Sequence, residues 1–164
     1  KMIITNAKKM MQLMGNSPYD FVMNHENHHL EGLENFVHRT FNGTDFQSFI
    51  QSLQNIYKNH EGLESVFAKN QEKDSLQKSI SEFKKIFFEI DHLARTQKHI
   101  SDPENNSAAK RINMFLRWMV RKDNAGVDFG IWQNIKPHQL VCPLDVHTKS
   151  ALRLRKIMAG GAFL

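Results

Sequence analysis

The sequence of 164 residues contains a single cysteine, Cys142, together with only four prolines and eight glycines. One cysteine excludes a disulfide framework and a zinc site built from several cysteines, and it favours a reducing, cytoplasmic location. The low proline and glycine content argues against a disordered or collagen-like chain. The longest run of apolar or small residues, 157–164, is too short to cross a bilayer, so we expect no membrane partner.

Hydrophobic residues make up 40% of the chain and charged residues 24%, which is typical of one soluble domain with a core of its own. Strand patterns are scarce, and apolar residues recur at the spacing of a helix face through most of the sequence. We therefore predict an all-α protein in which residues 1–164 form a single domain. The predicted helices cover 1–14, a segment from Pro18, 30–37, 45–57, 63–68, 75–93, 108–122 and 143–158, and Thr44 or Asp45 caps the fourth.

The net charge of +5 is distributed unevenly along the chain. Residues 1–100 hold 12 lysines and arginines and 12 acidic residues, whereas residues 101–164 hold 10 and 5. The uneven distribution of charge predicts a charge-neutral helical lobe over 1–100 and a basic hairpin-helix segment over 101–164. A localised positive excess fits a surface that binds phosphates, because neutralising them releases counterions from nucleic acid. A basic surface that only keeps the protein soluble is the alternative.

The predicted helix over 108–122 carries part of this charge on one face. Lys110, Arg117 and Arg121 recur there at helical spacing, with Arg111 beside them, while the apolar residues of the segment fall on another face. Such a stripe suits contacts with DNA phosphates.

Three aromatic residues, Trp118, Phe129 and Trp132, lie on this helix or in the loop after it. They are candidates for a base pocket, because enzymes that act on a base extrude it from the duplex and hold it between apolar faces. Packing in the core is the alternative, and we expect it for at least two of the three.

Residues 25–29 match the pattern His-Glu-x-x-His, which on one helix would bring His25 and His29 to a zinc ion with Glu26 as a general base. The tract lacks apolar flanks and a third ligand downstream, and His28 makes it simply rich in histidine. We therefore interpret it as a solvated helix end or loop and predict no metal site.

A second polar cluster, residues 38–41 (His-Arg-Thr-Phe), lies between aromatic residues. Its donors could line a ligand pocket or contact a phosphate. The favoured interpretation is a helix C-terminus, where His38 and Arg39 meet the negative end of the helix dipole.

Two segments carry a more specific pattern. Residues 107–121 place Lys110 in the first turn of a helix, and residues 142–148 (Cys-Pro-Leu-Asp-Val-His-Thr) place Asp145, 35 residues later, in the first turn of another. This arrangement resembles the helix-hairpin-helix DNA glycosylases, in particular the archaeal 8-oxoguanine branch. Up to about Thr148 the chain is also similar to an uncharacterised bacterial family distantly related to those enzymes.

The resemblance implies an incomplete helical array of the glycosylase type, in a chain truncated at both ends, that binds DNA without a metal or cofactor. It implies base excision, with or without lyase activity, in which Lys110 is the nucleophile and Asp145 stabilises the cationic sugar. The alternative is a non-catalytic nucleic-acid-binding helical protein or an inactive glycosylase-like fragment. In either case the expected DNA contacts are Asn106, Ser107, Arg111, Arg117 and Arg121.

Overall fold

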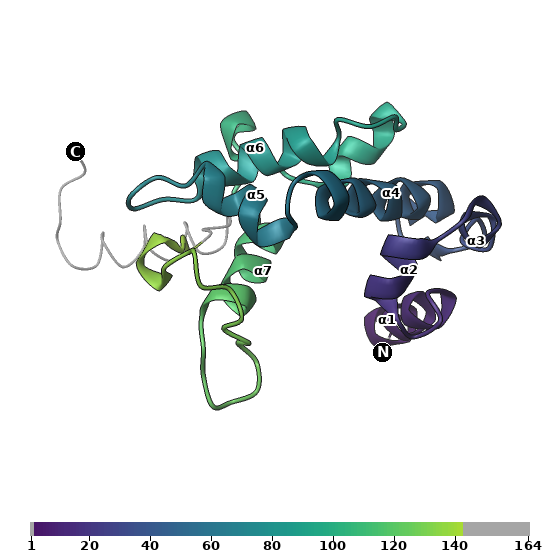
Figure 1. Cartoon of the computed structure of the whole chain (residues 1–164), viewed down its shortest axis with the longest axis horizontal. Coiled ribbons are helices and arrows are strands. Elements are labelled where there is room, and N and C mark those ends of the chain that lie inside the picture. The colour runs from purple at the N-terminus through teal and green to yellow at the C-terminus, as the bar shows by residue number, and fades with distance from the viewer. Residues whose placement is uncertain (1, 143–164) are drawn as a thin grey trace, which may run out of the picture.

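The computed structural model describes residues 2–142, which form an all-α fold with one short β-hairpin, as the scarcity of strand patterns predicts (Figure 1). None of the helices in this part of the chain has the length and hydrophobicity needed to span a bilayer. The 3-10 helices are η1 (Ala94–His99), η2 (Pro103–Asn105) and η3 (Pro137–Gln139). The α-helices are α1 (Met2–Leu13), α2 (Pro18–Asn24), α3 (Asn27–Glu31), α4 (Gly43–Asn59), α5 (Leu63–Lys69), α6 (Gln77–Phe87) and α7 (Lys110–Val120).

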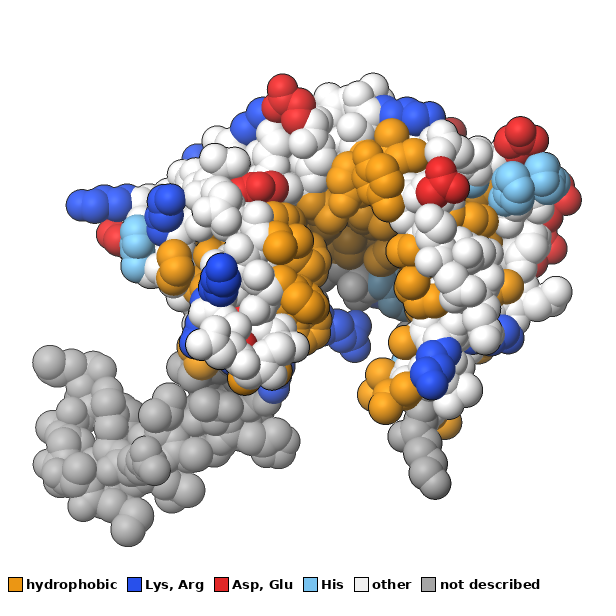
Figure 2. Space-filling view, turned by 60° about the horizontal axis from the view of Figure 1, so that its bottom comes forward, with side chains coloured by type: hydrophobic (Ala, Val, Ile, Leu, Met, Phe, Trp, Pro, Cys, Tyr) orange, Lys and Arg blue, Asp and Glu red, His pale blue; other side chains and the backbone are white. Residues whose placement is uncertain are grey.

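Helices α4, α5 and α6 lie across the molecule, and α1 and α2 extend downward from one end of this layer and α7 from the other (Figure 1). One end consists of α1, α2 and α3, and the other of α7 with the loop that follows it. Between these two ends the surface is hollowed, and hydrophobic side chains line the hollow (Figure 2).

Two hydrophobic clusters fill the interior, and α4 contributes to both because apolar residues recur along it at helical spacing. Phe46 and Ile50 belong to the cluster at α1–α3, whereas Ile56 belongs to the cluster of α5, α6 and α7. Leu53 packs against both clusters. Helix α4 therefore joins the two ends of the molecule.

The segment 30–37, predicted as a helix, contains the end of α3, a turn and strand β1 (Val37–His38). Arg39 has a φ of 58°, in the left-handed region, and the chain reverses there to form β2 (Phe41–Asn42). Val37 pairs with Asn42 and His38 with Phe41 in an antiparallel register. The interpretation of His38 and Arg39 as a helix C-terminus is therefore wrong.

Helix α4 is capped by Asn42, not by Thr44 or Asp45. Asn42 Oδ1 accepts a hydrogen bond from Asp45 N at 3.1 Å, and Asp45 Oδ2 accepts one from Asn42 N at 3.1 Å. This reciprocal pair satisfies two backbone donors at the helix start. Asp45 is thus the third residue of the helix.

Helix α6 ends at Phe87, although the apolar pattern predicts a helix as far as Leu93. Leu93 is 51% exposed and does not belong to the core. The chain turns after Phe88 and returns as η1 to the start of α4, where Thr96 donates a hydrogen bond to Asp45. The last predicted helix, 143–158, lies outside the described residues.

Candidate functional site

The hairpin between η2 and α7 is fixed to α6 by Asp102. Its Oδ1 accepts hydrogen bonds from Ser81 Oγ of α6 at 2.6 Å and from Glu104 N at 3.0 Å, and its Oδ2 accepts one from Asn105 Nδ2 at 2.8 Å. Burial by itself raises the pKa of Asp102, but these hydrogen bonds lower it overall below its usual value of 3.8. The ionised carboxylate therefore holds the hairpin in place.

Two residues of this hairpin, Asn106 (φ 59°) and Ala109 (φ 42°), adopt the left-handed backbone conformation. For alanine this costs roughly 1–2 kcal/mol, because its Cβ approaches the following carbonyl. The buried Asn113 helps to offset the cost, since its Nδ2 donates hydrogen bonds to Ala108 O at 3.0 Å and Ala109 O at 3.2 Å. The hairpin thus turns sharply without a glycine.

The predicted DNA contacts Asn106 and Ser107 lie at the tip of this turn. Asn106 N donates to Pro103 O at 3.1 Å, and Ser107 N donates to Asp102 O at 3.2 Å. Ser107 Oγ accepts a hydrogen bond from Ala109 N at 3.2 Å. Because both amides are used inside the hairpin, a contact from these two residues to a phosphate has to come from their side chains.

Lys110 is the first residue of α7 and is exposed, as is Arg111 beside it. The helix begins here, and not at the predicted Ala108, because Ala109 is left-handed. The first amides of a helix lack partners within it and create a positive potential, to which Arg111 adds. Asp145 lies outside the described residues, so its approach to Lys110 stays a prediction.

Arg117 and Arg121 both contact a buried carboxylate. Their Nε atoms lie 3.2 Å and 3.6 Å from Asp128 Oδ2, and the Asp128 side chain is fully buried, whereas the arginine side chains are 40% and 48% exposed. Part of the charge of the basic stripe is therefore neutralised within the protein. The role of these arginines as DNA contacts stays a prediction. The positive potential at this surface is weaker than the sequence indicates, because Asp128 neutralises part of their charge.

The candidate base-pocket residues Trp118, Phe129 and Trp132 gather around the C-terminal end of α7. The Trp132 ring packs against Phe67 and Phe115, with centroid distances of 5.8 Å and 5.5 Å. Trp118 and Phe129 are 37% and 57% exposed. The expectation that at least two of the three pack in the core is therefore wrong, because only Trp132 does so.

The positive excess of the chain is only partly located within the described residues. Residues 101–142 hold six lysines and arginines and four acidic residues, whereas residues 143–164 hold four and one. Three of the five excess positive charges thus lie outside the part that the structure describes.

The histidine tract is divided between two helices. Helix α2 ends at Asn24 with His25 as its C-cap, and Glu26 is the N-cap of α3. Glu26 N donates a hydrogen bond to His29 Nδ1 at 3.0 Å, and Glu26 O accepts one from His29 N at 3.0 Å, so Glu26 belongs to the start of α3. Within residues 2–142, no three His, Cys, Asp or Glu side chains are arranged to hold a metal ion.

Asp45 lies in a buried polar cluster, although the sequence predicts for it only the role of a helix cap. Its side chain is fully buried, and Oδ2 lies 3.2 Å from His99 Nε2 and 3.4 Å from Arg95 Nη2. Burial raises the pKa of Asp45, but hydrogen bonds from Thr96 and Asn42 and the neighbouring positive charges lower it overall. No local pattern identifies this cluster, because its partners come from η1, far along the chain.

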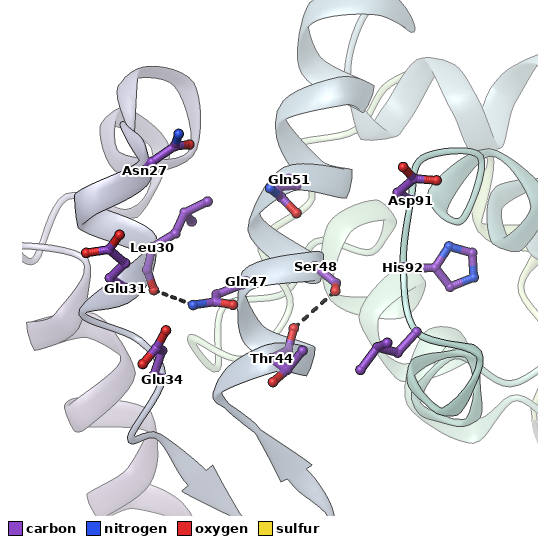
Figure 3. Close-up of a pocket in the computed structure, with 11 residues that line it drawn as sticks. Asn27, Leu30, Glu31, Glu34, Thr44, Gln47, Ser48, Gln51, Asp91 and His92 are labelled. Carbon is purple, nitrogen blue, oxygen red and sulfur yellow. Dashed lines mark hydrogen bonds between the residues drawn. The ribbon is translucent and has the colours of Figure 1, made fainter.

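A cavity of about 670 Å³ lies between α3, α4 and the segment 91–93 (Figure 3). Gln47 Nε2 of α4 donates a hydrogen bond to Leu30 O of α3 at 2.7 Å beside it. The charged residues that line this cavity, Glu31, Glu34 and Asp91, are all acidic. Because an acidic lining repels a phosphate backbone, the hairpin at Lys110 is the better candidate for a nucleic-acid site.

Comparisons with known proteins identify a family but not an activity. Neither a curated protein nor a solved structure matches the chain. A family model with the description "Protein of unknown function (DUF2400)" matches residues 1–160. The matched range includes the hairpin, Lys110 and Asp145 and covers nearly the whole sequence. The chain therefore belongs to the DUF2400 family.

Proposed function

We propose that the chain binds DNA at the hairpin before α7 and excises a base there, as a glycosylase of the helix-hairpin-helix type. The observation that carries this proposal is the position of Lys110. It is exposed, and it begins the helix that follows a hairpin held by Asp102 and Asn113. The sequence resemblance over 107–121 and 142–148 supports the same assignment.

The proposed chemistry begins with the neutral amine of Lys110, which is a nucleophile for the anomeric carbon of a nucleotide. Its lone pair forms a bond to C1′ while the bond from C1′ to the base nitrogen breaks. The electron pair of the broken bond leaves with the base, which takes up a proton, and the attached amine loses a proton. In this proposal the Asp145 carboxylate stabilises the positive charge that develops on the sugar.

The proposal assigns DNA binding to groups around the hairpin. Arg111 and the side chains of Asn106 and Ser107 would contact phosphates beside the extruded nucleotide. Trp118 begins about 12 Å from Lys110 along the axis of α7, so with Phe129 it would stack on neighbouring nucleotides and not on the reacting base.

Borohydride trapping on a duplex with a damaged or abasic site tests the proposal. Wild-type protein should form a covalent adduct with the DNA, and Lys110→Ala should form none. Lys122→Ala is the matched control, because it removes an exposed lysine just beyond the other end of α7, and it should still be trapped. Asp145→Asn should retain DNA binding and lose excision.

The outcome that contradicts base excision is DNA binding by the wild-type protein, sensitive to salt, without an adduct or a released base. It would favour the alternative, a nucleic-acid-binding protein without catalytic activity. Absence of DNA binding at low salt would contradict both the proposed base excision and the non-catalytic nucleic-acid-binding alternative.

A further inference from the structure

A positively charged surface lies at the end of the molecule away from α7 (Figure 1). Three segments form it: helix α1, the β1–β2 hairpin and η1. Together these segments contain five lysines and arginines, all exposed, and no aspartate or glutamate. We call these five residues the basic surface: Lys8, Lys9, Arg39, Arg95 and Lys98.

Helix α1 contacts the hairpin through one of its faces. Asn6 Nδ2 lies 2.6 Å from His38 Nδ1 of β1. Lys9 Nζ lies 6.0 Å from the centroid of the Phe36 ring, just before β1. Because residues three apart lie on the same face of a helix, Asn6 and Lys9 make these contacts together. Lys9 is therefore a neighbour of the hairpin.

The segment η1 contacts the turn of the same hairpin. Arg95 Nη2 donates a hydrogen bond to Thr40 O at 3.0 Å, and Thr40 follows Arg39 directly in the chain. Arg95 and Arg39 are therefore neighbours on the basic surface. The Arg95 guanidinium also lies 3.4 Å from the buried Asp45 Oδ2, which neutralises part of its charge.

Arg39 is in the left-handed backbone conformation at the tip of the hairpin, with a φ of 58°. This conformation is costly for a side chain with a Cβ, whereas glycine adopts it freely and asparagine tolerates it. The Arg39 side chain is exposed, and none of residues 2–142 forms a hydrogen bond or an ion pair with it. Folding gives no reason for an arginine here, which favours contact with a ligand.

The positive and negative charges of the lobe over 1–100 balance in number but are separated in space. Glu31, Glu34 and Asp91, from neighbouring segments, line the cavity of about 670 Å³, whereas the segments of the basic surface contain no acidic residue. A surface that only keeps a protein soluble mixes charges of both signs. A surface of one sign is complementary to a polyanion.

We propose that the basic surface binds the phosphate backbone of duplex DNA, as a second contact besides the hairpin before α7. The inference takes its partner from the proposed function but does not depend on the chemistry of Lys110. The Arg39 guanidinium donates paired hydrogen bonds to the oxygens of one phosphate, and Lys9 contacts another as a point charge. Such contacts read no base, so binding at this surface is independent of sequence.

Fluorescence anisotropy at several salt concentrations tests the proposal, with a duplex of about 30 base pairs, roughly 100 Å long, that can reach both ends of the molecule. Arg39→Asn and Lys9→Ala should each weaken binding roughly tenfold and reduce the slope of log affinity against log salt by about one unit. Arg39→Lys keeps the charge and should retain the slope. A wild-type slope for Arg39→Asn would overturn the proposal.

Lys73→Asn is the matched control. It removes one positive charge from an exposed position in the loop between α5 and α6, outside the basic surface, and should leave the slope unchanged. A reduction as large as that in Arg39→Asn would show that net charge alone controls binding, and it would overturn the proposal.

Thermal unfolding separates a lost contact from a damaged fold. Because asparagine tolerates the left-handed conformation, Arg39→Asn should unfold at the wild-type temperature or above it. A lower unfolding temperature, together with a wild-type slope for Lys9→Ala, would show that Arg39 stabilises the hairpin and would overturn the proposal.

Borohydride trapping with the wild-type protein separates this inference from base excision. A covalent adduct, with unchanged salt slopes in Arg39→Asn and Lys9→Ala, would contradict the basic surface alone. Reduced slopes in these variants, without any adduct, would support the basic surface and contradict base excision.

Discussion

Thr96 Oγ1 donates a 2.8 Å hydrogen bond to Asp45 Oδ1 in the buried interior, although 51 residues separate the two in the sequence. This contact joins η1 to the first turn of α4. The same carboxylate also accepts from the backbone of Asn42, so one buried side chain both caps a helix and fixes a distant segment. The stability of the fold should therefore be sensitive to each group around Asp45.

Thr96→Val should lower the free energy of unfolding by about 1–3 kcal/mol, because it leaves a buried carboxylate oxygen without its partner. Valine keeps the shape of the side chain, so lost packing contributes little. Urea unfolding measures the change. Thr40→Val, at an exposed position, is the control and should change the stability little. Equal loss in both variants would show that the buried hydrogen bond is unimportant.

The lowered pKa of Asp45 predicts a loss of stability in acid. A carboxyl group whose pKa is lower in the folded state stabilises the fold above its unfolded value, 3.8, and loses this contribution as the pH falls through the folded value. Unfolding free energies from neutral pH to below 3.8 should therefore fall less steeply for Asp45→Asn than for the wild type. Asp74→Asn, at an exposed position, should retain the wild-type slope.

Gly43→Ala should destabilise the protein, although helix propensity alone favours alanine by about 1 kcal/mol. A Cβ atom at this position would lie 2.5 Å from the Cα and the carbonyl carbon of Glu34, so the backbone would have to move. We expect a loss of roughly 1–3 kcal/mol in thermal or urea unfolding. At Gly32 the nearest atom to such a Cβ is His29 O at 3.3 Å, and Gly32→Ala should cost less.

The pairing of Arg117 with Asp128 predicts a coupling between the two residues. Arg117→Ala should lower the unfolding free energy by about 1 kcal/mol, a modest value because the guanidinium is partly exposed and screened. Removing Asp128 as well should cost less than the sum of the two single changes, because no buried charge is left without its partner. A double-mutant cycle measures this, and simple additivity would contradict the pairing.

Arg111 and Arg117 should differ in their effect on DNA binding. Arg111 is exposed at the start of α7, whereas Asp128 neutralises part of the charge of Arg117. If the hairpin binds DNA, Arg111→Ala should reduce the slope of log affinity against log salt by about one unit, and Arg117→Ala by less. Fluorescence anisotropy at several salt concentrations measures both slopes. A larger effect at Arg117 would indicate that it leaves Asp128 to contact phosphate.

The sequence by itself determined the all-α class and the approximate position of most helices. Those features depend on hydrogen bonds between residues four apart and on apolar residues that recur every three or four positions. Both can be recognised within a short segment of sequence. For this reason the helix that carries Lys110 and Arg117 follows from residues 108–122 alone, although it ends at Val120 and Arg121 is its C-cap.

Only the tertiary structure decided what those side chains contact. The loop after α7 returns to bring Asp128 against Arg117 and Arg121, and η1 returns to bring Thr96 against Asp45. The division of the histidine tract between two helix ends also depends on where α2 stops and α3 starts. Contacts between distant segments arise from how the chain packs, and no short sequence pattern encodes them.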